Sequence, residues 1–333
     1  MSEHYASFEQ SYHGLDAIWL RYGAYEAVAI PGIGGNLVAF RDTEKKLTIL
    51  REPGESEIEQ FRKTPAVYGI PVLFPPNRYE DGKFAWKGTT YQLPINEPEN
   101  NNHLHGFVHE VPWTVEGHGA NALESYLVMS QHVSEGHPMY HYLPFTFTIT
   151  LRYSLCADGL QQQLTIRNEG KEEMPNLIAF HTAINAPFAE ESTADDYSLT
   201  LTMDKRRELN ERSLPTGKFQ TLTHEEELMK STGINPYFEA MDNHYTAQPV
   251  NGRNVMELTD TKQNITLVYD AGTSYKHWMV WNCGASRQFF CPEPQMNMIN
   301  APNVQGMDPE EIGLVGLAPG DIFEETSRLY IKS

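Results

Sequence analysis

A strict alternation of apolar and polar residues between positions 145 and 155 constrains the fold more than any other feature of the chain. One side of this segment is aromatic or aliphatic, and the other carries threonine, serine and arginine. Because successive side chains of a strand point to opposite faces, the pattern predicts a β-strand with one buried face. A turn at residues 157–159 and a second strand at residues 160–167 follow, which predicts a β-hairpin.

The rest of the chain repeats this strand signature in short segments separated by turn residues. Glycine occurs 24 times and proline 21 times, as a chain with many tight turns requires. The Gly-rich segment at residues 31–36 has no long helical pattern after it, so we expect a turn between two strands there. Further strands are predicted at residues 27–30, 126–130, 177–184, 197–203, 265–269, 278–281, 288–291 and 322–331.

Helical signals are restricted to two short segments. Thr223 and Glu226 have the spacing of a capping box ahead of Leu228. Asp308, followed by Pro309, is a second candidate cap for a short helix. The chain has no repeat of 20–50 residues and no low-complexity linker. We therefore predict one all-β domain over residues 1–333, a sandwich or a barrel in which two sheets cover each other's apolar faces.

Charge and cysteine content narrow the class of protein. The chain has 25 basic and 44 acidic residues, a net charge of −19, so nucleic acids and anionic membrane surfaces are poor partners. No apolar run is long enough to span a membrane, and the first residues lack the pattern of a signal peptide. The three cysteines include no Cys-x-x-Cys pair. We expect a cytoplasmic protein without structural disulfides.

A proline-rich segment at residues 68–78 ends in Asn77 and Arg78. Three prolines restrict the backbone there, which favours a guanidinium that is aimed at a ligand oxygen with little entropy to lose. The alternative is an ordinary surface arginine that pairs with Glu80 or Asp81.

Three histidines, His103, His105 and His109, lie within seven residues. If the segment is a strand, all three share one face. The pair His103 and His105, followed by Glu110, resembles the first metal-binding motif of cupins. Acid–base chemistry by one histidine on a sugar or carbonyl is a second interpretation, and a polar loop without function is a third.

Two further segments place a titratable side chain in an apolar setting. His181 lies in a predicted buried strand. Glu293 lies between two prolines, directly after another predicted apolar strand. Burial among apolar neighbours would raise the pKa of Glu293 toward the range of a useful base. The alternatives are a hydrogen-bonded core histidine and a carboxylate that meets only solvent at the end of a strand.

In chain order, these segments resemble the aldose 1-epimerase (galactose mutarotase) family. Each motif is weak alone, but the ordered set spans nearly the whole chain. The matching positions are residues 31–36, 77–78 with 81–84, 102–106, 181, 215–217, 242 with 244–245, 293 and 317–321. The resemblance implies a single-domain β-supersandwich that interconverts sugar anomers without a metal or cofactor.

The resemblance also implies residue roles. Glu293 corresponds to the base that takes the proton from the C1 hydroxyl, and His181 to the acid that protonates the ring oxygen. His105 corresponds to a histidine that positions the ring oxygen. The residues expected to bind the sugar are Arg78, Asp242, Asn77 and His103. Phe290, Trp281 and Tyr245 are candidates for stacking on the sugar ring.

Three other functions stay open at this point. A hexose-6-phosphate mutarotase would need cationic anchors, and residues 205–207 form the only dense basic cluster. A cupin-like metal enzyme would use His103, His105 and Glu110, with His181 as a distant ligand. A non-catalytic sugar-binding sandwich would bind without chemistry. In each sugar-binding case we expect a small aldose as partner and a monomer or homodimer.

Overall fold

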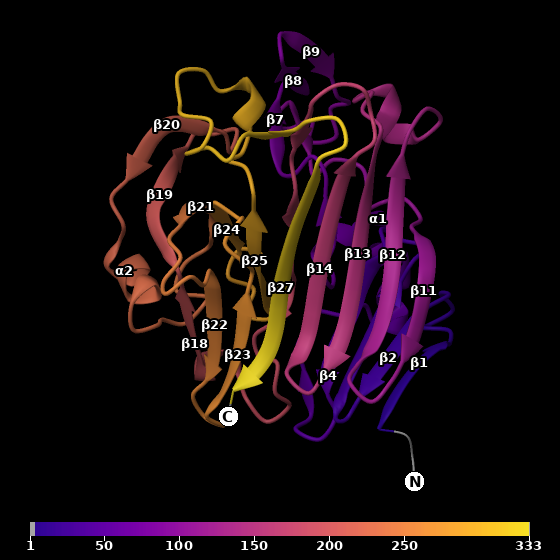
Figure 1. Cartoon of the computed structure of the whole chain (residues 1–333). Coiled ribbons are helices and arrows are strands. Elements are labelled where there is room, and N and C mark those ends of the chain that lie inside the picture. Colours follow the sequence, from indigo (N-terminus) through magenta and orange to yellow (C-terminus); the bar gives the residue numbers. More distant parts are fainter. Residues whose placement is uncertain (1–3, 333) are drawn as a thin grey trace.

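Three β-sheets contain most of the strands in the computed structural model, which describes residues 4–332 (Figure 1). The all-β sandwich predicted from the strand pattern is confirmed. Residues 1–3 and 333 of the predicted single domain lie outside the described part of the chain.

An antiparallel eight-stranded sheet crosses the front of the molecule in Figure 1. Its strands, in spatial order, are β11 (Thr114–Ala120), β12 (Ser125–Val133), β13 (Phe147–Cys156), β14 (Gly159–Asn168), β27 (Ile322–Lys332), β23 (Ile265–Asp270), β22 (Val255–Asp260) and β18 (Tyr197–Leu201). The predicted hairpin is β13 and β14, closed by the pair Cys156 and Gly159. Strand β13 begins two residues later than predicted, because the Phe145 N–H donates to the Leu143 carbonyl in a tight turn.

A second eight-stranded sheet holds the segments with candidate chemistry. Its strands are β20 (Pro215–Gln220), β19 (Met203–Leu209), β21 (Asp242–Ala247), β24 (His277–Trp281), β25 (Phe289–Gln295), β16 (Ala179–Phe180) and β6 (Val72–Leu73), with β17 (Ile184–Asn185) paired to β25. The strand predicted at residues 177–184 is therefore two short strands with a gap between them. The strand predicted at residues 288–291 is longer and includes Glu293.

The N-terminal part forms a five-stranded sheet, and three two-stranded sheets complete the described strands. The five strands are β1 (Tyr5–Glu9), β2 (Ile18–Tyr22), β3 (Tyr25–Ile30), β4 (Asn36–Asp42) and β5 (Leu47–Thr48). The pairs are β7 (Arg78–Glu80) with β10 (Asn102–Leu104), β8 (Lys83–Trp86) with β9 (Thr89–Gln92), and β15 (Met174–Asn176) with β26 (Val315–Leu317). The turn predicted at residues 31–36 links β3 to β4.

Helices are few and short. They are α1 (Ile58–Lys63), α2 (His224–Lys230) and the 3-10 helices η1 (Glu55–Glu57), η2 (Pro65–Val67), η3 (Pro138–His141), η4 (Ala194–Asp196) and η5 (Ala301–Asn303). Helix α2 begins with the predicted capping box, in which Thr223 accepts from the Glu226 N–H. The helix predicted after Asp308 is wrong, because that segment forms only turns. No helix among residues 4–332 combines the length and apolar character that crossing a bilayer requires.

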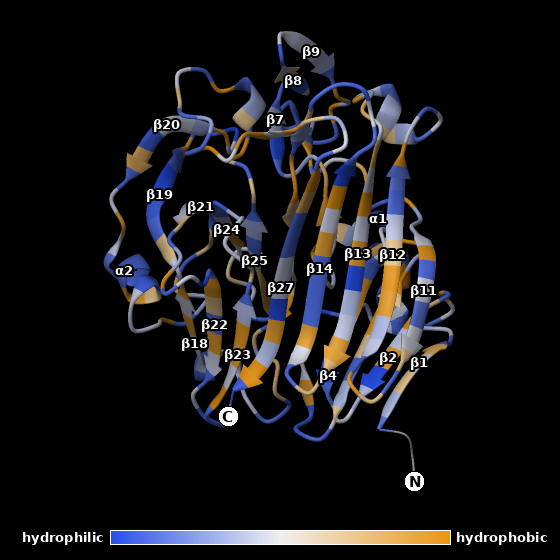
Figure 2. Cartoon of the chain, viewed as in Figure 1, coloured by the Kyte–Doolittle hydropathy of each residue, from blue (hydrophilic) through white to orange (hydrophobic). Residues whose placement is uncertain are grey.

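One continuous apolar core joins the three sheets. It includes Leu37 of β4, Leu151 of β13 and Trp278 of β24, all fully buried. Alternate residues of β13 and β14 point into it, and bands of opposite hydropathy alternate along these strands in Figure 2. This core fixes the second sheet against the first and so determines where its side chains point.

The backbone at Gly106 makes an unusually close approach to the proline-rich segment. Gly106 has φ +68°, and a Cβ there would lie 2.1 Å from the Phe74 carbonyl oxygen. Gly88 also has a positive φ, +82°, but faces open space. Substituting each of the two glycines in turn therefore separates the free-energy cost of a left-handed conformation from the cost of a steric clash.

We expect Gly106→Ala to destabilise the protein at least twice as much as Gly88→Ala. The second substitution carries only the left-handed penalty of about 1–2 kcal/mol, whereas the first also displaces the Phe74 backbone. Urea denaturation of both variants measures the difference. Equal losses of stability would contradict the close packing of these two segments.

Candidate active site

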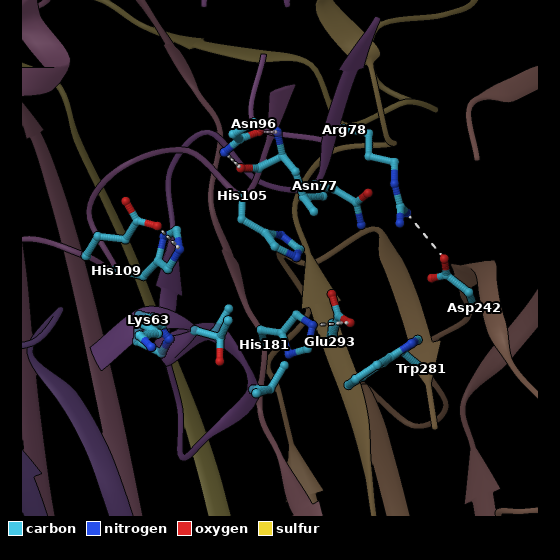
Figure 3. A pocket seen from close by; sticks show the side chains of 16 residues that line it. Lys63, Asn77, Arg78, Asn96, His105, His109, His181, Asp242, Trp281 and Glu293 are labelled. Atoms are coloured by element: carbon cyan, nitrogen blue, oxygen red, sulfur yellow. Dashed lines mark hydrogen bonds and ion pairs between the residues drawn. The ribbon is translucent and has the colours of Figure 1, made fainter. Parts of the chain in front are cut away.

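A cavity of about 390 Å³ opens over one end of the second sheet (Figure 3). Its wall includes side chains from β21, β24 and β25, and from the segments around β7 and β10. A cavity of this size falls in the range of roughly 300–1,000 Å³ that small-molecule sites occupy. The polar groups that converge on it decide what it can do.

Glu293 and His181 meet in the wall of this cavity. Glu293 Oε1 lies 3.1 Å from His181 Nε2, and their side chains are only 3% and 6% exposed. Figure 3 shows the two groups facing each other between Trp281 and His105. A carboxyl and an imidazole 3.1 Å apart and shielded from bulk water can exchange protons with a bound molecule as an acid–base pair.

Local chain geometry explains how Glu293 reaches this position. Strand β25 runs through both flanking prolines and is buried along its whole length, so Glu293 lies within the strand rather than after it. On the side away from β24, β25 pairs with β17 at Phe290 and with β16 at Gln295. The stretch between these pairs has no ladder partner on that side, and a strand tolerates proline where no backbone donor is needed.

His181 comes from the same interruption of the sheet. It follows β16 directly, and its backbone N–H donates to the Pro71 carbonyl, while the Ala183 N–H donates to Gly69. The chain between β16 and β17 is therefore bonded to the proline-rich segment instead of to β25. This detour turns the His181 ring toward Glu293.

The three clustered histidines do not share one strand face, because β10 ends at Leu104. His105 and Gly106 both have positive φ, and the backbone turns there. The His105 and His181 rings lie 5.2 Å apart, and His109 also lines the cavity. His103 does not line it: its Nδ1 lies 2.8 Å from the Pro94 carbonyl oxygen, and its ring packs on Phe107.

Arg78 lines the cavity across from Glu293 and His181. Its Nε donates to both oxygens of Glu97, at 3.0 and 3.2 Å, and its Nη1 lies 3.3 Å from Asp242. The alternative partners, Glu80 and Asp81, instead bind Arg212. The guanidinium is thus held between two carboxylates, and Figure 3 shows it directed at the cavity. Neighbouring Asn77 also lines the cavity and is buried.

Burial governs the protonation of the cavity wall. It lowers the pKa of His181 to about 4 and that of His109 to about 3, and lowers that of His105 well below its ordinary value. It also raises the pKa of Glu293 well above that of an ordinary carboxyl, and the nearby Asp242 adds to this rise. The histidines are therefore neutral at neutral pH unless a bound group or Glu293 supplies a proton.

Among the aromatic candidates, the structure brings only Trp281 to the cavity. Its ring lies 5.9 Å from that of His181. Phe290 is buried in the core, and Tyr245 donates to Glu226 outside the cavity. A half-buried indole that lines the cavity beside His181 can offer its ring to the apolar side of a sugar.

Several wall residues were not found from sequence. They are residues 63–67, at the end of α1 and in η2, together with Asn96, and Glu97 behind them as the partner of Arg78. Residues 58–63 carry no helix-start signal that stands out, so the helix itself was missed. Asn96 and Glu97 lie in a loop without a recognisable motif, and only the fold brings Asn96 to the cavity and Glu97 to Arg78.

The alternative functions find less support in the geometry. Within residues 4–332, no three His, Cys, Asp or Glu side chains converge as metal ligands would, so the cupin-like set is not assembled. Of the basic cluster, Arg206 pairs with Glu226, and the fully buried Arg207 pairs with Glu311. None of residues 205–207 lines the cavity.

Comparison with known proteins identifies relatives along most of the chain. A galactose mutarotase-like protein from Clostridium acetobutylicum of known structure is 33% identical, with a TM-score of 0.94 over 98% of each chain. The uncharacterized protein YihR of Escherichia coli K12 is 26% identical over 63% of this chain and 61% of its own. The galactose mutarotase of Rattus norvegicus is 25% identical over 49% of this chain and 45% of its own. The chain thus matches less than two thirds of the length of these curated relatives.

The family assignment rests on both sequence and fold. The sequence model of one family, aldose 1-epimerase, matches residues 16–328. The motifs that carry the resemblance are distributed over the same range, and the structural relative shares the arrangement of strands from end to end. The chain belongs to the aldose 1-epimerase family.

Proposed function

We propose that this protein is a mutarotase that interconverts the α and β anomers of free aldohexoses. The observation that carries the proposal is the buried contact of 3.1 Å between Glu293 Oε1 and His181 Nε2 in the cavity wall. The two oxygens that exchange protons in mutarotation, O1 and O5 of a pyranose, are bonded to the same carbon. An acid and a base that serve both oxygens must therefore lie side by side, as these two groups do.

Glu293 and His181 can together hold each proton that moves in the reaction. Glu293 removes the proton of the O1 hydroxyl while His181 delivers one to O5, the C1–O5 bond breaks, and C1=O1 forms. After rotation about C1–C2, the O5 hydroxyl attacks the other face of C1, His181 recovers its proton, and Glu293 returns its own to O1. No net proton is gained or lost, so a pair that holds a single exchangeable proton is sufficient.

The remaining wall residues are suited to hold the sugar. His105 beside His181 is placed to bind near the ring oxygen, and Trp281 offers an aromatic face. Arg78 and Asp242 present a donor and an acceptor to hydroxyl groups on the opposite side. Asn77 is a further candidate, whereas His103 is left out of the proposal because it faces Pro94.

The charge of the wall favours an uncharged sugar over a sugar phosphate. Lys63 and Arg78 are its cations, against the carboxyl groups of Glu110, Asp242 and Glu293. Arg78 is already paired with two carboxylates. A phosphate dianion is held in proteins by unopposed cationic donors, so the balance of charges in the wall supports a neutral aldose.

The cytoplasmic location and the monomeric or homodimeric state of the protein stay predictions.

We expect Glu293→Gln to lower the catalysed rate of mutarotation by about 10²–10⁴-fold, because the amide cannot accept the O1 proton. The measurement is polarimetry on freshly dissolved α-D-glucose and α-D-galactose, with the spontaneous rate subtracted. Glu226→Gln is the matched control, since Glu226 is also a fully buried carboxyl but lies outside the cavity. Full activity of Glu293→Gln would remove this carboxyl from the mechanism, and a wild-type protein that binds sugar without catalysis would support the non-catalytic sandwich.

The catalysed rate should be flat around neutral pH and, on the acidic side, fall as the pH drops toward 4. Burial lowers the pKa of His181 to about 4 and raises that of Glu293, so the pair keeps one proton across this range. Below this pH range, a second proton binds to the pair, and Glu293 can no longer accept the proton of O1. Initial rates measured from acidic to neutral pH test this, and an acid limb near the ordinary histidine pKa of about 6.5 would contradict it.

A further inference from the structure

We propose that Gln295 is a positioning residue that holds the second carboxyl oxygen of Glu293 and so directs the first toward His181. The inference rests on the proposed mutarotase function and names a residue that supports its base. It is carried by one contact, in which Gln295 Nε2 donates to Glu293 Oε2 at 3.2 Å. Both side chains are buried, Gln295 completely.

The strand explains why this contact is well defined. Glu293 and Gln295 are two residues apart on β25, so their side chains project from the same face of the sheet. The backbone of Gln295 is paired on both sides, with His277 of β24 and with Ala179 of β16. Its amide group therefore starts from a backbone that neighbouring strands hold in place, as a supporting residue requires.

The chemistry of the two side chains determines the orientation of the amide. A carboxylate only accepts hydrogen bonds, whereas an amide has one donor end and one acceptor end. Turning the Gln295 oxygen toward the carboxylate of Glu293 would set lone pairs against lone pairs in a buried site and leave Oε2 without a donor. The donor end must therefore face Glu293.

The two oxygens of Glu293 then have separate partners. Oε1 contacts His181 and Oε2 contacts Gln295. The last torsion of a glutamate side chain is soft and has no sharp preferred value. A donor fixed to Oε2 restricts that torsion and keeps Oε1 where the O1 proton must arrive.

Gln295 also stabilises the ionised form of the base without adding charge. The titratable or charged groups around the carboxyl of Glu293 are His181, Asp242 of β21, Arg78 of β7 and Cys291 of β25, with His105 beside His181 and His277 opposite Gln295. Burial raises the pKa of Glu293, Asp242 adds to the rise, and the Gln295 hydrogen bond and Arg78 oppose it. Because Arg78 is shared between two other carboxylates, the neutral amide is the donor that serves Glu293 directly.

The test is the variant Gln295→Met, which keeps the length and approximate volume of the side chain but cannot donate. We expect kcat to fall about 10- to 100-fold with little change in KM, since a hydrogen bond to a charged group is lost at the base and not at the sugar hydroxyls. The alkaline limb of the rate profile, where the pair loses its last proton, should move to higher pH. The sign follows because the carboxylate loses a donor, which raises the pKa of Glu293.

Gln162→Met is the matched control. Gln162 on β14 is equally buried, lies outside the cavity, and has no hydrogen-bond partner for its amide among residues 4–332. It should retain wild-type kcat and an unshifted pH profile. If both variants lose activity in proportion to their loss of thermal stability and neither shifts the alkaline limb, Gln295 is merely structural and the proposal is overturned.

A second variant, Gln295→Glu, keeps the assay informative if the methionine variant folds poorly. A protonated carboxyl can donate to Glu293, but an ionised one cannot and repels it. Activity should therefore decline as pH rises through the range in which wild type is constant. A wild-type-like kcat and pH profile in either variant would overturn the positioning role. An inactive wild-type protein would instead overturn the proposed function.

Discussion

The contact between a buried carboxyl and a buried imidazole is the constraint on which the rest of the site depends. Taking either charge out of water alone is expensive, which is why burial lowers the pKa of His181 and raises that of Glu293. Held 3.1 Å apart, the two groups can share one proton at no net charge. That arrangement tolerates burial and also suits the proposed reaction, in which protons exchange at two oxygens bonded to one carbon.

The interruption of the second eight-stranded sheet, between β16 and β17, makes this pair possible. A continuous strand at residues 177–184 would have paired with β25 and pointed alternate side chains into the core. The gap between β16 and β17 instead hydrogen-bonds to Gly69 and Pro71, and it frees the edge of β25 at its two prolines. Around the pair, further side chains have positions set by other segments: Arg78 is held by Glu97, and His105 sits on a turn whose glycine touches Phe74. Rigid supporting contacts of this kind keep a reactive geometry in place.

Much of this was predictable from residue patterns. The alternation of apolar and polar residues predicted the hairpin of β13 and β14. The ordered motifs indicated one family and, through that resemblance, the site residues Glu293, His181 and Arg78. The errors are equally informative. The histidine segment does not form the strand that would have aligned His103 with His105, because His105 and Gly106 turn the backbone. The helix expected after Asp308 forms only turns, and α1 has no marked start signal.

The sequence by itself determined the local structure and the family, because strand alternation, turn residues and motif order act over short stretches of chain. Only the tertiary structure decided which of the three clustered histidines line the cavity beside His181, which carboxylates hold Arg78, and which aromatic residue reaches the cavity. These are contacts between side chains from separate strands and loops, and they depend on how the sheets pack on their shared core. No pattern within a single segment carries that information, since the residues of one segment are the same however the sheets pack on each other.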